Sequence, residues 1–127
     1  MLIVYDSKMG KTEKFVKKTK LPSIKLSTEL IVNEPFILVT YTTGGRTEKP
    51  CPPESTLEFL KRNSNFLIGV ASSGHRNWGK DRFAVAADII SKMYNVPLIH
   101  KFEMSGFPND VTTFLEGVNK IYGKDIS

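Results

Sequence analysis

The chain has 127 residues, 40% of them hydrophobic and 24% charged, which excludes a disordered or fibrous protein and predicts one domain over residues 1–127. Its formal net charge is +5, but the 18 Lys and Arg residues are spread along the chain, so we expect no nucleic-acid partner. No apolar run approaches the roughly 18 residues of a membrane-spanning helix, and no secretory signal is evident, so we expect a cytoplasmic protein with no membrane partner.

Strands and helices alternate in the predicted chain order. Short apolar or β-branched runs predict the strands, and apolar residues that recur on one face predict the helices. The predicted strands cover residues 2–5, 24–26, 36–41, 66–71 and 97–104. The predicted helices cover residues 13–18, 54–62, 82–94 and 111–122. This alternation predicts an α/β fold, with a five-stranded parallel sheet, right-handed crossovers and helices on both faces.

Five parallel strands suit the spatial order 2-1-3-4-5. In sheets of this kind, ligands bind beyond the carboxyl ends of the strands, next to the point between the first and third strands where the winding direction changes. We therefore expect the polar loops after the first, third and fourth strands to form one site.

Spacing excludes three other kinds of site. The segment Gly10 to Thr12 would end a Walker A motif, but Tyr5 stands where that motif needs its first glycine. A phosphoacceptor receiver has an acidic pair after its first strand, whereas Asp6 stands alone. A cysteine phosphatase of this fold carries its nucleophile in the same loop, and the only cysteine, Cys51, lies elsewhere. The sequence therefore predicts no P-loop NTPase, receiver or phosphatase.

The loop after the first strand is suited to bind a phosphate. Its backbone N–H groups and the helix N-terminus form a concave anion site, and the hydroxyls of Ser7 and Thr12 are further donors. The alternative is that Ser7 only caps the helix and Gly10 only makes the turn. The predicted phosphate-binding residues are Ser7, Lys8, Met9, Gly10, Lys11 and Thr12.

The loop after the third strand has two successive glycines, which leave the backbone open to a flat ligand and permit a peptide flip. An ordinary glycine turn is the alternative, but it does not explain the neighbouring Tyr-Thr-Thr. The predicted ligand-binding residues of this loop are Thr42, Thr43, Gly44 and Gly45.

The loop after the fourth strand contains the only tryptophan, Trp78, within a polar stretch. A tryptophan there either packs on the core or stacks on a planar ligand. The Asn77 amide has donors and an acceptor for a pyrimidine-like edge. The predicted ligand-binding residues of this loop are Ser73, Gly74, His75, Asn77, Trp78 and Gly79. No carboxylate stands beside His75 or His100 at a spacing typical of metal ligands, so we expect no metal site.

Four segments together resemble the NrdI family of flavodoxin-like proteins, over nearly the whole chain. They are Tyr-Asp-Ser-Lys-Met-Gly-Lys-Thr, Thr-Tyr-Thr-Thr-Gly-Gly, Ala-Ser-Ser-Gly-His-Arg-Asn-Trp-Gly and Lys-Phe-Glu-Met-Ser-Gly. The third is the most specific, because it is similar to the family's Ala-Ser-Gly-Asn-Arg-Asn-(Trp/Phe)-Gly. The resemblance implies a flavodoxin-like three-layer sandwich that binds flavin mononucleotide (FMN). The first loop would then hold the phosphate and the other two the isoalloxazine, with Trp78 stacked on it.

The resemblance also implies a function and partners. In the family, reduced flavin reacts with molecular oxygen, and the superoxide or peroxide formed oxidises the dimanganese centre of the small subunit of class Ib ribonucleotide reductase toward its tyrosyl radical. An unidentified flavin reductase would supply the electrons. The chain would be an accessory redox protein without catalytic residues of its own. A generic flavodoxin electron shuttle and a flavin-free interaction scaffold are the alternatives.

The chain departs from the family pattern at three places. Met9 stands where threonine is common, His75 where asparagine is usual, and the segment over residues 45–53 is several residues longer. Basic residues around the loops predict that the reduced, anionic flavin is stabilised. These are Arg46, Lys49, Arg76, Lys80 and Arg82.

Overall fold

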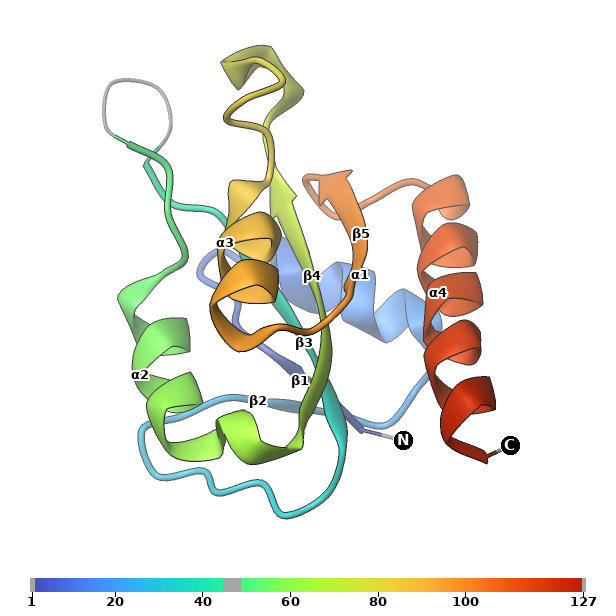
Figure 1. The fold of residues 1–127 in the computed structure, drawn as a ribbon. Coiled ribbons are helices and arrows are strands. Elements are labelled where there is room, and N and C mark those ends of the chain that lie inside the picture. The colour runs from blue at the N-terminus through green and yellow to red at the C-terminus, as the bar shows by residue number, and fades with distance from the viewer. Residues whose placement is uncertain (1, 45–48, 127) are drawn as a thin grey trace.

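Five parallel strands form one sheet, in the spatial order β2-β1-β3-β4-β5 (Figure 1). The computed structural model describes residues 2–44 and 49–126, with side chains in the last helix described up to residue 122. The strands are β1 (Leu2–Tyr5), β2 (Ser23–Lys25), β3 (Phe36–Tyr41), β4 (Leu67–Gly74) and β5 (Leu98–Glu103). The predicted strand order is confirmed.

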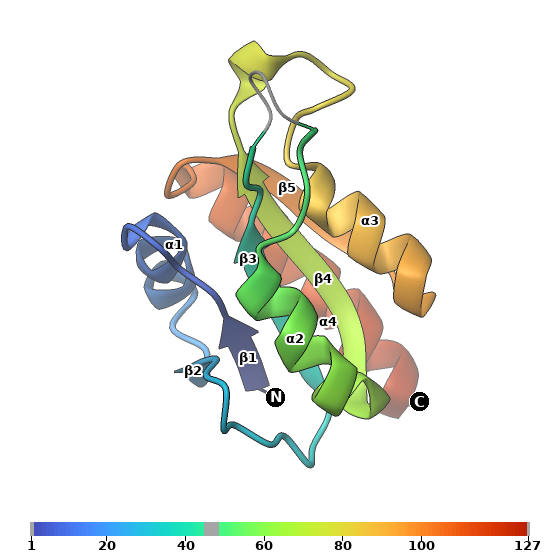
Figure 2. The same ribbon diagram turned by 90° about the vertical axis from the view of Figure 1, so that its left-hand side faces the viewer.

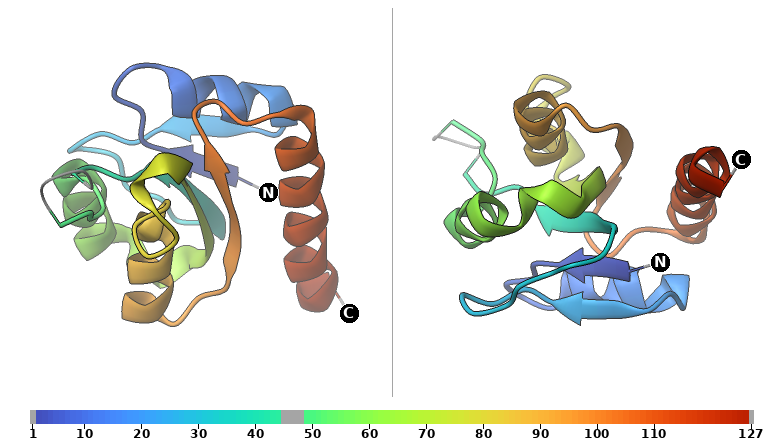
Figure 3. Two further views of the ribbon diagram at one scale, coloured as in Figure 1. Left: turned by 90° about the horizontal axis from the view of Figure 1, so that it is seen from above. Right: turned by 60° about the horizontal axis from the view of Figure 1, so that its bottom comes forward.

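Two helices cover each face of the sheet, which confirms the three-layer sandwich (Figure 3). The helices are α1 (Lys11–Thr19), α2 (Glu54–Asn63), α3 (Val85–Tyr94) and α4 (Pro108–Ile126). Phe15 of α1 and Phe114 of α4 pack in one core, and Phe59 of α2 and Ile90 of α3 pack in the other. In Figure 2, α2 lies in front of the sheet and α4 behind it. Among the described residues, none of the helices is both long and apolar enough to cross a membrane.

The central strand β3 is buried on both faces. Residues 36–40 have no exposed surface, and their side chains alternate between the two cores. Phe36 and Leu38 pack toward α2 and α3, whereas Ile37 and Val39 pack toward α1 and α4. This double burial explains why the strand has a continuous apolar sequence instead of an alternating one.

Strand β4 is longer than the sequence predicts. A polar loop is expected from Ser72, but Ser72 and Ser73 pair with both β3 and β5, and Gly74 still pairs with β5. The Ser72 hydroxyl is tolerated in the core because it donates to the Ala84 carbonyl at 2.7 Å and accepts from the Ala87 N–H at 2.9 Å. The prediction of a loop at these residues is therefore wrong.

Helix α3 begins at Val85, three residues later than the predicted start at Arg82. Ala84 has a φ of 49°, in the left-handed region that interrupts a right-handed helix. Gly74 of β4 permits this close approach, since a Cβ there would lie 2.4 Å from the Ala84 nitrogen. The predicted helix boundary is wrong because this contact between distant residues is invisible in the local sequence.

The end of β1 is tied to α1 by a buried tyrosine. Tyr5 is 4% exposed, and its hydroxyl donates to Glu13 Oε1 at 2.8 Å. Burial, together with the hydrogen bond and the charge of Glu13, raises the pKa of Tyr5 from 10.0 to about 12. The pair fixes the direction in which the loop after β1 leaves the sheet.

A buried carboxylate, Asp6, joins β1 to α2 beneath that loop. Asp6 Oδ2 accepts hydrogen bonds from Ser55 Oγ at 2.5 Å and from Thr56 Oγ1 at 2.7 Å. Thr56 Oγ1 also lies 2.8 Å from Thr40 Oγ1 in β3. Since a helix N-terminus favours negative charge, the start of α2 is a suitable place for this carboxylate.

We expect Asp6→Ala to lower the free energy of unfolding by about 2–4 kcal/mol, because two hydroxyls at the start of α2 lose a charged acceptor. Urea denaturation measures the change. Asp81→Ala, at an exposed position, is the control and should change stability by less than about 0.5 kcal/mol. Equal unfolding midpoints for the two variants would contradict the role assigned to Asp6.

We expect the free energy of unfolding to fall at alkaline pH because of the raised pKa of Tyr5. Because its folded-state pKa is raised, its contribution to stability is present below pH 10 and is lost as the pH rises toward about 12. Over this interval, the stability advantage of the unaltered chain over Tyr5→Phe should shrink by about 2 kcal/mol. Urea denaturation at a series of pH values tests this, and parallel curves for the two proteins would refute it.

Candidate functional site

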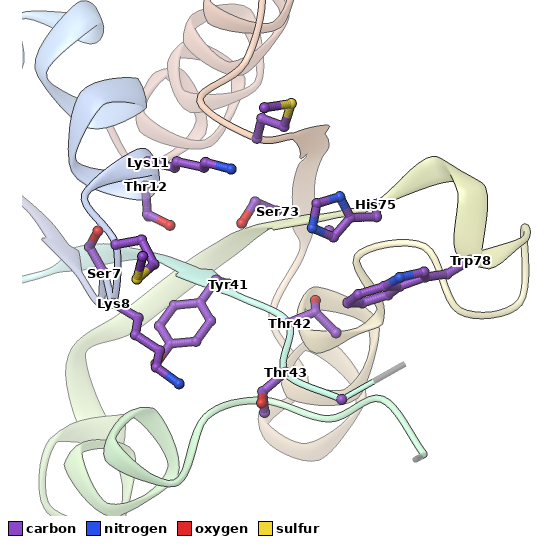
Figure 4. A pocket seen from close by; sticks show the side chains of 14 residues that line it. Ser7, Lys8, Lys11, Thr12, Tyr41, Thr42, Thr43, Ser73, His75 and Trp78 are labelled. Carbon is purple, nitrogen blue, oxygen red and sulfur yellow. The ribbon is translucent and has the colours of Figure 1, made fainter. Parts of the chain in front are cut away.

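A cleft of about 280 Å³ opens at the carboxyl ends of β1, β3 and β4 (Figure 4). Its walls come from the loop after β1, the ends of β3 and β4 with the loops that follow, and the turn after β5. The lining residues are Ser7, Lys8, Met9, Lys11, Thr12, Tyr41, Thr42, Thr43, Gly44, Ser73, Gly74, His75, Trp78 and Met104. The three loops that were expected to converge thus meet at one cleft.

Most of the predicted site residues line this cleft. Those that do so are Ser7, Lys8, Met9, Lys11, Thr12, Thr42, Thr43, Gly44, Ser73, Gly74, His75 and Trp78. Among the described residues, Gly10, Asn77 and Gly79 are predicted members that do not contribute to the lining. Gly10 and Gly79 instead shape their loops, with φ values of 88° and 97°. Gly45 lies outside the described residues, and ligand binding by the whole set stays a prediction.

The sequence prediction omits two lining residues, Tyr41 and Met104. Tyr41 ends β3, and Met104 directly follows β5. The rule that ligands bind beyond the carboxyl ends of parallel strands applies to both positions, so it was the signal available for them. Neither is typical of a polar loop, because Tyr41 belongs to a buried strand and Met104 is apolar.

The loop after β1 leads into the N-terminus of α1 through a left-handed glycine. Gly10 adopts a left-handed conformation, with φ 88° and ψ −4°, which turns the chain into the helix. Ser7 Oγ accepts hydrogen bonds from the N–H groups of Gly10 at 3.0 Å and Glu13 at 3.4 Å. The N–H groups of Lys11 and Thr12 belong to the first helical turn, where no intrahelical carbonyl serves them. Because both residues line the cleft, these N–H groups are available to an anion there.

Two buried hydroxyls point into the cleft, those of Thr12 and Ser73 (Figure 4). Thr42 is used differently, because its Oγ1 accepts the Ala86 N–H at 3.2 Å and its own N–H donates to the Ser73 carbonyl at 3.0 Å. Thr42 thus holds the end of β3 to β4 and to α3, while Thr12 and Ser73 offer hydrogen bonds to a ligand.

Tyr41 forms a partly buried wall of the cleft. Burial raises the pKa of Tyr41, the negative charge of Asp6 raises it further, and a hydrogen bond with Ser55 partly offsets the rise. The phenol is therefore protonated and neutral near pH 7. A neutral aromatic side chain at this place suits the planar part of a ligand.

Trp78 lies across the cleft from the first loop (Figure 4). It ends a short 3-10 turn, Arg76–Trp78, and its ring centroid lies 4.9 Å from that of His75, with the planes tilted by 55°. Neither of the two hydrophobic cores formed by the described residues includes Trp78. This arrangement favours stacking on a ligand over the alternative of a core anchor.

The segment after Gly44 is closed at its base by two backbone hydrogen bonds. The Thr43 N–H donates to the Cys51 carbonyl at 2.9 Å, and the Cys51 N–H donates to the Thr43 carbonyl at 3.0 Å. Gly44 sits just beyond this base with a φ of 74°, a left-handed conformation that favours glycine. Residues 45–48 of the extended loop lie outside the described residues.

The cations that line the cleft are Lys8 and Lys11, from the loop after β1 and the first turn of α1. Arg76, one of the basic residues that flank the loops, has its guanidinium 4.6 Å from the centroid of the Phe83 ring, and its effect on a ligand stays a prediction. Arg46, another of the expected cations, lies outside the described residues. Among the described residues, positive charge in the lining therefore lies next to the free N–H groups at the start of α1.

His100 has a carboxylate partner that the sequence pattern did not reveal. Its Nε2 lies 2.8 Å from Asp110 Oδ1, and Asp110 Oδ2 accepts the Phe107 N–H at 2.7 Å. Burial alone would raise the pKa of Asp110, but these hydrogen bonds and the charges of His100 and Arg76 lower it below its ordinary value. In the part of the chain that the structure describes, no three His, Cys, Asp or Glu side chains gather to hold a metal ion.

Solved structures with this fold include two flavodoxins. A flavodoxin from Streptococcus pneumonia TIGR4 is similar with a TM-score of 0.69, at 22% identity, over 97% of each chain. A short-chain flavodoxin associated with a bacterial microcompartment is similar with a TM-score of 0.66, at 15% identity, over 97% of this chain and 96% of that one. These likenesses confirm the flavodoxin-like fold.

Sequence comparison adds the family. The family model described as NrdI Flavodoxin like matches residues 3–116. Protein NrdI of Bacillus licheniformis is 47% identical over 124 residues, which cover 96% of this chain and 90% of the relative. Protein NrdI of Macrococcus caseolyticus is 44% identical over 123 residues, which cover 95% of this chain and 91% of the relative. The chain therefore belongs to the NrdI family of flavodoxin-like proteins.

Proposed function

We propose that the chain binds FMN in this cleft and that its reduced flavin reacts with oxygen to supply superoxide or peroxide to the small subunit of a class Ib ribonucleotide reductase. The setting is the cytoplasm, with a flavin reductase as electron donor. The family membership supports the role, and the flavodoxin fold supports the cofactor. One observation carries the flavin proposal, namely that an anion-binding helix N-terminus and an aromatic wall face the same cleft.

The residues present fit the two chemically different ends of FMN. The phosphate would be held by the N–H groups of Lys11 and Thr12, by the Thr12 hydroxyl and by the charges of Lys8 and Lys11. The flat, largely apolar ring system would lie toward Tyr41 and Trp78, whose faces suit stacking.

When bound, the flavin supplies reversible redox chemistry that no side chain of this cleft can perform. The residues of the chain bind and orient it. Thr42 and Ser73 keep the ends of β3 and β4 in register at the base of the cleft, through the backbone hydrogen bond of 3.0 Å between them. Gly44 presents backbone without a Cβ, so its peptide can approach the ring edge and turn toward or away from it.

Loss of one cation should weaken FMN binding selectively. We expect Lys11→Gln to raise the Kd for FMN roughly five- to tenfold, since a charge-assisted contact with the phosphate is lost. Lys14→Gln makes the same charge change at an exposed position of α1 outside the cleft lining, and should leave the Kd unchanged. Flavin fluorescence measures binding. Equal losses in the two variants would contradict a phosphate site at the start of α1.

The function itself is tested by radical formation. Reduced, FMN-loaded protein mixed with oxygen and a manganese-loaded class Ib small subunit should produce a tyrosyl radical, which electron paramagnetic resonance detects. The same concentration of free reduced FMN should produce far less. In Trp78→Ala, the radical yield should fall in proportion to the flavin content.

Flavin uptake without any radical would favour the generic electron shuttle, and absence of flavin uptake would favour the flavin-free scaffold.

A further inference from the structure

The turn after β5 supplies a wall of the cleft that lies outside the three predicted loops. Met104, at the start of this turn, lines the cleft and is 48% exposed, so its side chain is not part of either core. A thioether offers no donor or charge to a phosphate, but it packs well against apolar and aromatic groups. Met104 is therefore suited to contact the planar part of a ligand.

The backbone of this turn is held in an unusual conformation. Met104 has a φ of 57°, which side chains other than glycine rarely adopt, and Gly106 has a φ of 76°. The Gly106 N–H donates to the Glu103 carbonyl at 2.9 Å. A Cβ on Gly106 would lie 2.6 Å from Phe15 Cδ1, so the turn packs tightly on α1.

Lys18, near the C-terminus of α1, is hydrogen-bonded to the turn after β5. Its Nζ donates to the carbonyl of Ser105 at 3.2 Å and to the carbonyl of Gly106 at 3.1 Å. The first turn of α1 carries Lys11 and Thr12, which line the cleft directly. One helix therefore forms one wall of the cleft and, through Lys18, sets the position of another.

We propose that Met104 is a flavin-contact residue and that Lys18 is a positioning residue that keeps Met104 at the cleft. The inference rests on the proposed function, because it takes the flavin ring as the ligand. It concerns the ring and not the phosphate, so it makes a distinct prediction for riboflavin, which has the same ring as FMN but no phosphate.

The experiment compares Lys18→Met with Lys17→Met. Lys17 is the exposed neighbour on the same helix, so both variants remove one charge from almost the same place. We expect Lys18→Met to raise the Kd values for FMN and for riboflavin severalfold and by the same factor. Lys17→Met should leave both values unchanged. Lys18→Arg, which keeps donors for the two carbonyls, should restore most of the affinity.

Met104→Gly separates a binding role from a structural one. Glycine suits a φ of 57° better than methionine does, so this variant should unfold at the same urea concentration as the unaltered chain or a higher one. Its affinity for both flavins should nevertheless fall severalfold. Unchanged affinity in Met104→Gly would overturn the assignment of Met104 as a contact residue.

Two results would overturn the role of Lys18. One is equal affinity in Lys18→Met and Lys17→Met. The other is a loss for FMN alone, because that would mean an electrostatic effect on the phosphate. The unaltered chain is titrated first with both flavins. Failure of the proposed function then appears as no flavin uptake at all, whereas failure of this inference appears as uptake that the Lys18 and Met104 variants leave intact.

Discussion

The buried carboxylate of Asp6 is the interaction on which the arrangement of the cleft depends. It accepts hydrogen bonds from Ser55 and Thr56 at the start of α2, and its backbone N–H donates to the Val39 carbonyl at 3.0 Å. The ends of β1 and β3 are thereby fixed to one helix directly beneath the first loop. A parallel sheet brings its strand ends to one edge, but a network of this kind decides how those ends are spaced.

Helix α1 depends on a second constraint, an aromatic cluster under the sheet. The Phe15 ring stacks on that of Phe102, with centroids 3.8 Å apart, and meets the Phe114 ring edge-on at 5.4 Å. Together with the hydrogen bond from Tyr5 to Glu13, this packing holds the helix in its first turn and at its middle. A helix that is fixed in this way can present its first N–H groups to a ligand without reorganisation on binding.

The sequence predicted the strand order and most of the cleft, because both follow from short-range patterns. Apolar runs mark buried strands, and the polar loops at their carboxyl ends must meet when the strands are parallel. The errors lie where distant residues decide the local structure. By its own sequence Ser72 is typical of a loop, but its hydroxyl is satisfied by backbone groups at and just before the start of α3. Helix α3 starts late because Gly74, which has no Cβ, leaves room for Ala84. Met104 follows β5 directly, where the carboxyl-end rule applies, but an apolar residue in a short turn was not counted among the polar loops.

Part of the net charge of +5 lies in the lining of the cleft. Among the described residues, the Lys and Arg side chains in the lining are those of Lys8 and Lys11, and a bound phosphate would largely neutralise them. Arg76 lies over the Phe83 ring, with its guanidinium 4.6 Å from the ring centroid. Positive charge and the N–H groups at the start of α1 therefore lie on one side of the cleft, and Trp78 lies on the other (Figure 4).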